Sequence, residues 1–154
     1  MKKLIGVAGS VAVLAVVIAG CGSDSEGSGD SASASASPTV TADDLEGTTY
    51  TSTSVEGHDL ITGTEVVLGF EDGSLSVAAG CNTHSAPYEV DAATIRWTGD
   101  PASTMMACSD ELSAQEEWVN GLFADGVTAE TDGSRLTLTS GGDDVTIVLE
   151  SSSS

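Results

Sequence analysis

The cysteines and histidines of this 154-residue chain could take part in chemistry, and three of the five lie in two short segments. The first segment, residues 79–88, contains a cysteine, an asparagine and a histidine, and the second, residues 103–108, ends in a cysteine. Outside these segments the candidates are His58 and Cys21. Such side chains could form a disulfide, a metal site or a nucleophilic centre, and each of these requires a particular spacing.

The spacing matches no common catalytic or metal-binding pattern. The sequence has no Gly-x-Ser-x-Gly elbow, so a serine hydrolase lacks its nucleophile signature. It also has no His-Glu-x-x-His, glycine-rich phosphate loop or calcium loop. His84 is interpreted as a solvent-exposed loop residue; if it acts, it does so as a binding residue or pH-sensitive contact, since no acid-base partner is spaced to meet it. We therefore expect no enzyme, no metal ion and no cofactor.

The amino terminus has the pattern of a lipoprotein signal. Lys2 and Lys3 precede an uncharged apolar run over residues 4–18, about 15 residues, which is too short for a membrane-spanning helix of roughly 20. The sequence Ile-Ala-Gly before Cys21 resembles a bacterial lipobox, which predicts cleavage after residue 20 and lipidation of Cys21. The alternatives are an ordinary signal peptide or an uncleaved anchor. A multiply acylated cysteine would hold the protein on the outer face of the bacterial cytoplasmic membrane.

Composition divides the rest of the chain into a spacer, one domain and a tail. Residues 21–42 contain almost only Ser, Gly, Ala and Asp, so they have little to bury and are expected to be disordered. Apolar residues recur over 43–150, about 105 residues, enough for a single core. The tail, 151–154, is four serines and is expected to be disordered.

The chain is strongly acidic, with a formal net charge of −20. Removing residues 1–20 takes away both lysines and leaves two arginines against 24 acidic residues, a net charge of 2 − 24 = −22. Such a surface repels phosphate backbones, which excludes nucleic acid as a partner. Its simplest role is to keep an exposed protein soluble, and we expect a monomer.

The dominant period within the domain is two, which predicts a mainly β fold. Alternating apolar residues favour strands with one buried face, and Asp-Gly pairs favour tight antiparallel hairpins. About eight short strands on one core predict a compact antiparallel barrel, which removes exposed edges. The predicted strands are 49–55, 66–70, 75–79, 88–90, 94–98, 127–131, 136–139 and 145–149.

One segment has helical spacing instead. Ser113 and Glu116 have the spacing of a capping box, and Trp118, Leu122 and Phe123 follow on one helical face. A single helix is predicted over residues 112–124, docked on the sheet or across the barrel mouth.

Cys81 and Cys108 are expected to pair with each other. In an exported chain with Cys21 acylated, no other cysteine remains. A loop of 27 residues predicts about 3.6 kcal/mol of stabilisation from the bridge. Two buried free thiols, or a redox-active pair, remain the alternatives.

Two motifs resemble the META domain of HslJ-like proteins. They are Gly80-Cys81-Asn82 followed by Tyr88, and the later run Ser103, Thr104, Met105, Met106, Ala107 and Cys108. The resemblance covers about residues 45–149 and implies a lipocalin-like barrel with one helix, often behind a lipoprotein signal, with no established catalytic activity.

Both motifs have structural explanations. Gly80 permits a turn, Asn82 can bond backbone groups two residues on, and Ser103 and Thr104 can do the same for their loop. Met105 and Met106 are expected to be adaptable core fillers. The motifs are therefore interpreted as a structural clasp rather than a binding site.

The expected function is a non-enzymatic, lipid-anchored extracytoplasmic protein in cell-envelope maintenance or stress. It would act through contacts with an unidentified envelope protein or a small molecule. The alternative is a lipocalin-like carrier for an apolar ligand inside the barrel, which a packed interior would disfavour.

Overall fold

The computed structural model describes residues 39–142 and 144–152, and these form one β barrel with two helices. The predicted signal peptide, the lipidation at Cys21 and nearly all of the predicted spacer lie outside the described residues. The elements, in chain order, are α1 (Ala42–Leu45), β1 (Thr49–Glu56), β2 (Val67–Glu71), β3 (Ser74–Ala78), β4 (Thr83–Asp91), β5 (Thr94–Trp97), β6 (Ala102–Ser103), α2 (Asp110–Asp125), β7 (Val127–Asp132), β8 (Arg135–Ser140) and β9 (Val145–Ser152).

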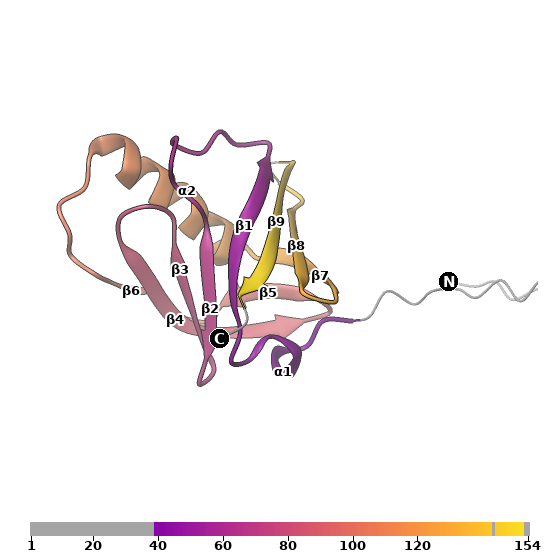
Figure 1. Cartoon of the computed structure of the whole chain (residues 1–154). Coiled ribbons are helices and arrows are strands. Elements are labelled where there is room, and N and C mark those ends of the chain that lie inside the picture. The colour runs from indigo at the N-terminus through magenta and orange to yellow at the C-terminus, as the bar shows by residue number, and fades with distance from the viewer. Residues whose placement is uncertain (1–38, 143, 153–154) are drawn as a thin grey trace, which may run out of the picture. The chain divides into compact units, whose positions relative to one another are not determined.

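Eight antiparallel strands close into a ring. The order is β3-β2-β1-β9-β8-β7-β5-β4, and pairing of β3 with β4 completes the circle. The two-residue strand β6 pairs with the start of β4, beside β5 on the same edge. The predicted mainly β, lipocalin-like barrel of eight strands is therefore confirmed, with β6 as an addition (Figure 1).

The Asp72-Gly73 turn joins β2 to β3 as a tight hairpin, as predicted. Asp72 and Gly73 both have positive φ, 52° and 72°, as a two-residue type I′ turn requires. The register that follows pairs Phe70 with Leu75 and Leu68 with Val77, so these four apolar side chains share the inner face.

The barrel interior is filled by side chains. Leu and Phe residues from neighbouring strands are almost completely buried, and each contributes about 2 kcal/mol by leaving water. Inward-facing residues with 1% exposure or less include Leu68, Phe70, Leu75, Val77, Ile95, Leu136, Leu138, Ile147 and Leu149. A barrel of eight strands is just wide enough for side chains to fill, and this one is filled.

Helix α2 lies across the barrel end where β3 passes into β4, while α1 lies near the opposite end (Figure 1). The predicted helix exists, but it begins at Asp110, and its N-cap is Ser109, whose hydroxyl accepts from the Leu112 N–H. The predicted capping box at Ser113 is wrong, because Ser113 lies one turn inside the helix. Of the predicted docking residues, Leu122 and Phe123 are buried and Trp118 is partly buried.

Two other differences come from tertiary pairing. Strand β4 begins at Thr83 rather than near Tyr88, because it pairs with β3 along Ser74–Ala78. Ala86 is buried within this strand. Strand β9 continues to Ser152, where it pairs with Thr49, two residues past the expected domain end. Among the described residues, no helix is long and apolar enough to cross a membrane.

Candidate functional site

The two sequence motifs meet at the hairpin turn that joins β3 to β4 and so closes the barrel. The turn has Gly80 at φ +118°, a conformation that favours glycine. A Cβ at Gly80 would lie 2.8 Å from Thr64 Cγ2 and 2.9 Å from Leu112 Cδ2. Glycine is therefore required here both by the backbone and by the close approach of its neighbours.

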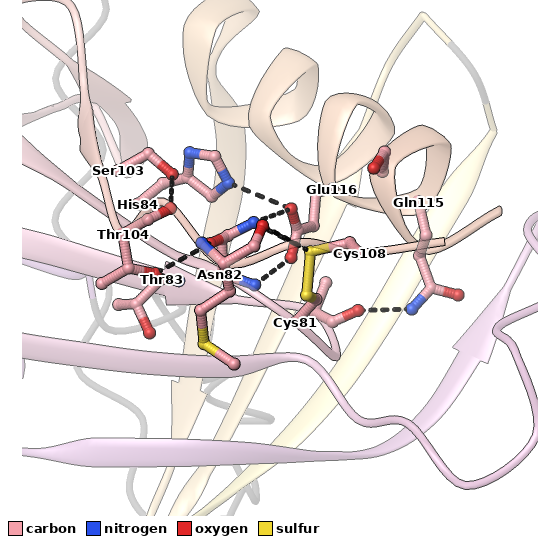
Figure 2. A network of polar contacts seen from close by, with 12 residues as sticks. Cys81, Asn82, Thr83, His84, Ser103, Thr104, Cys108, Gln115 and Glu116 are labelled. Atoms are coloured by element: carbon pink, nitrogen blue, oxygen red, sulfur yellow. Dashed lines mark hydrogen bonds and ion pairs between the residues drawn. A yellow bond between two sulfur atoms is a disulfide. The ribbon is translucent and has the colours of Figure 1, made fainter. Parts of the chain in front are cut away.

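The predicted disulfide is present. Cys81 in this turn is bonded to Cys108, just before α2, across a sequence separation of 27 and with Cα atoms 6.1 Å apart. Two free thiols are therefore not the state described here. The bridge ties the β3–β4 turn to the start of the helix (Figure 2).

Asn82 connects the turn to the second motif. Its Oδ1 accepts from the Met106 N–H at 2.9 Å and from Thr104 Oγ1 at 3.0 Å. Its Nδ2 donates to Glu116 Oε2 at 3.2 Å, and its backbone N–H donates to Glu116 Oε1 (Figure 2). The expectation that Asn82 bonds groups two residues on is wrong, because its partners lie 22 to 34 residues away.

Glu116 is a buried carboxylate, 5% exposed, on the inner face of α2. Burial raises its pKa, but the backbone and side-chain N–H groups of Asn82 and the neighbouring His84 together outweigh this, so the pKa lies below its ordinary value. Its assignment to a capping box was wrong. Glu116 instead stabilises Asn82 as a charged hydrogen-bond acceptor.

His84 lies inside strand β4, not in an exposed loop. Its side chain is 15% exposed, and its Nε2 is 3.6 Å from Glu116 Oε2, beyond hydrogen-bond distance. That nitrogen is buried and has no hydrogen-bond partner among the described residues. The structure thus places beside His84 the carboxylate that sequence spacing did not predict.

Gln115 forms a second anchor next to Glu116. Its Nε2 donates to the Ala79 carbonyl at 2.6 Å and to Thr64 Oγ1 at 2.9 Å, while its Oε1 accepts from the Ile61 N–H at 2.7 Å. Gln115 is 3% exposed. Sequence reasoning missed it; the available signal was two consecutive polar residues on the face of α2 that also carries Val119 and Phe123.

The second motif forms an exposed segment held at defined points. Thr104 Oγ1 accepts from the Thr83 N–H at 3.1 Å, and Ser103 Oγ donates to the carbonyl of Thr104. Met105 is 96% exposed and Met106 is 63% exposed. Their predicted role as core fillers is wrong. The Asn82 side chain accepts from the backbone N–H of Met106, and both methionine side chains remain exposed to solvent. We call residues 104–107 the clasp loop.

Tyr88 lies at the other end of the barrel, away from the clasp loop. Its ring packs on Phe70, with centroids 5.2 Å apart, and its hydroxyl donates to Glu46 Oε2 at 3.3 Å. Burial, followed by the charge of Glu46, raises the pKa of Tyr88 to about 12. Its role is to join β4 to the segment after α1.

The chemistry available to this arrangement is limited. The sulfurs of Cys81 and Cys108 and an oxygen of Glu116 lie within 4.8 Å of one another, but the sulfurs are bonded to each other and are not thiolate ligands. Both oxygens of Glu116 already accept N–H groups from Asn82, so Glu116 is not placed as a free general base for His84.

Comparison with known proteins agrees with this architecture. The family description "META domain" matches residues 43–153, almost all of the described part. The chain belongs to the META-domain family. No curated protein sequence is similar enough to this chain to count as a match.

Two solved structures are similar to this barrel in fold. One, determined by NMR, is 18% identical with a TM-score of 0.56, covering 72% of this chain and 94% of the other. A second NMR structure, of a protein from Burkholderia xenovorans, is 16% identical with a TM-score of 0.57, covering 73% and 87%. At these identities the likeness concerns the fold alone.

Proposed function

We propose that this META-domain protein is a non-enzymatic contact protein, lipid-anchored through Cys21 on the outer face of the bacterial cytoplasmic membrane. It would serve cell-envelope maintenance or stress by binding another envelope protein through its clasp loop. The observation that carries the proposal is the exposure of Met105 and Met106, 96% and 63%, on a segment fixed to the barrel.

The clasp loop is preorganised for contact. Asn82 holds Thr104 and Met106, and the disulfide fixes Cys108, so the segment is restrained from both ends. A loop that is already ordered loses less conformational entropy when a partner binds. Methionine side chains adapt to irregular apolar surfaces, which suits them to protein contact.

The packed barrel favours contact over carriage. A carrier for an apolar ligand needs an interior space, whereas the inward-facing side chains here are buried against one another. The buried Glu116 also has an evident structural task, since it accepts from Asn82, which in turn holds the clasp loop.

Site-specific photo-cross-linking on intact cells tests the contact. With a photo-reactive residue introduced at position 105 of the full chain, we expect a discrete cross-linked species. The same residue at position 139, on the exposed side of β8, serves as the matched control and should give none. Asn82→Ala, which frees the loop, should reduce the yield at position 105. Equal cross-linking at positions 105 and 139, or none at 105, would contradict the proposal.

A further inference from the structure

A separate hollow lies between α2 and the segment that joins β5 to β6. Its volume is about 380 Å³, within the range of small-molecule sites. Trp97, Asp100 and Pro101 line one side, and Asn120, Gly121 and Ala124 of α2 line the other. The clasp loop lies outside this set, and the barrel interior is not part of it.

The wall at Trp97 is rigid. Its indole N–H donates to the Leu75 carbonyl at 3.3 Å, and its ring packs against Phe123 with centroids 5.8 Å apart. Only 7% of Trp97 is exposed. A flat apolar group entering the hollow would therefore meet a fixed aromatic surface.

Gly121 has no structural explanation within the helix. It lies in the middle of α2, where glycine is among the least favourable residues, and its φ is not in the positive region. A Cβ built there would meet no atom within 4 Å. Gly121 lines the hollow, and the space that its side chain would enter is open.

Asn120, the neighbouring residue, carries an unsatisfied amide. Its Oδ1 is enclosed by protein atoms and has no hydrogen-bond partner among the described residues. Buried polar atoms normally have partners, so an orphan next to a hollow requires an explanation. Asn120 also lines the hollow, so a ligand N–H that reached this amide oxygen could supply the missing bond.

We infer that this hollow binds a small, flat organic cation, such as an aromatic amine or amidine. Its ring would lie against Trp97, its N–H groups would bond Asn120, and its charge would face Asp100. The acidic chain, with a net charge of −20, favours a cation over an anion. This site is independent of the contact function proposed above.

Benzamidine is a suitable probe, and the uncharged compound benzamide is its matched control. In a Trp118→Phe background, Trp97 is the remaining tryptophan, so its fluorescence reports on the hollow. We expect a saturable change with benzamidine, with a dissociation constant of about 1 mM or lower, and weaker binding of benzamide. No saturable change with benzamidine in the folded protein would overturn the inference.

Two variants locate the binding. Gly121→Leu should fill the hollow and abolish the response, whereas Ala114→Leu, at an exposed position on the same helix, should retain it. Unchanged binding by Gly121→Leu overturns the inference. Asp100→Asn, in an exposed loop, should weaken benzamidine about two- to fivefold and leave benzamide unaffected. If circular dichroism shows that Gly121→Leu is unfolded, the Asp100→Asn variant decides the matter. Equal weakening of benzamidine and benzamide binding by Asp100→Asn would then overturn the inference.

Discussion

At the scale of single residues, Glu116 supports the order of the clasp loop through its hydrogen bonds to Asn82. A carboxylate that is 5% exposed would be costly if it lacked partners, yet its oxygens accept the backbone and side-chain N–H groups of Asn82. Asn82 in turn holds Thr104 and Met106. The order of the exposed loop therefore depends on one buried charge.

Glu116→Gln should lower stability by about 2 kcal/mol at neutral pH, because a hydrogen-bond acceptor with full charge is lost and an amide N–H faces Asn82 Nδ2. The pKa of Glu116 is lowered in the folded state. Its stabilisation is therefore complete above the ordinary value of 4.5 and is lost as pH falls through the lower folded pKa. Urea unfolding across this range should show the difference between wild type and variant shrinking with acidity.

The matched control is Glu117→Gln, one residue along on the exposed face of α2. It removes the same charge without touching Asn82, so it should change stability little and with no such dependence on pH. Identical pH profiles for the two variants would refute the role assigned to Glu116.

At the scale of elements, the β3–β4 turn determines whether the barrel closes. Gly80→Ala should destabilise the protein by about 2–3 kcal/mol, because φ is +118° and the new Cβ would lie within 3.0 Å of the side chains of Thr64 and Leu112. Gly63→Ala separates the two causes, since φ there is +87° but nothing lies within 4 Å of its Cβ. Thermal or urea unfolding should show a clearly smaller loss for Gly63→Ala, and equal losses would mean that crowding at Gly80 does not matter.

The elements that sequence predicted are those whose causes are local. The alternation in residues 75–79 and the Asp72-Gly73 turn depend on neighbours in the chain, so β2, β3 and their hairpin were predicted. The short helix α1 and strand β6 were not predicted, because four and two residues carry too little pattern. The start of β4 was missed because it is set by pairing with β3.

The candidate site was predictable in part for the same reason. The disulfide follows from counting the cysteines that remain when export and acylation of Cys21 are predicted, and the turn follows from Gly80. The bonds of Asn82 join residues up to 34 positions apart, and no local pattern brings them together. The exposure of the His84 and Met105 side chains was predicted wrongly. Exposure depends on which segments pack over a side chain in the folded domain, and the local sequence does not show this.

At the scale of the whole molecule, the charge determines how the protein can be held at a membrane. Both arginines of the chain are already paired, Arg96 with Glu89 at 2.6 Å and Arg135 with Glu150 at 3.0 Å. The described domain thus offers no basic patch to an anionic lipid surface, and its acidic groups are repelled by one. Under the function proposed above, stable membrane attachment therefore comes from a lipid on Cys21 and not from the surface of the domain.

A variant in which an ordinary cleavable signal peptide replaces residues 1–21, and which therefore lacks both Cys21 and the apolar run 4–18, should be absent from the membrane fraction, since no electrostatic contact remains to retain it. High salt should not release the wild-type protein, because screening weakens charge attraction but not the insertion of acyl chains. Fractionation of cells with and without salt, read by immunoblot, measures both. A variant without residues 1–21 that stays with the membrane, or a wild-type protein that salt releases, would show that something other than a lipid at Cys21 holds it there.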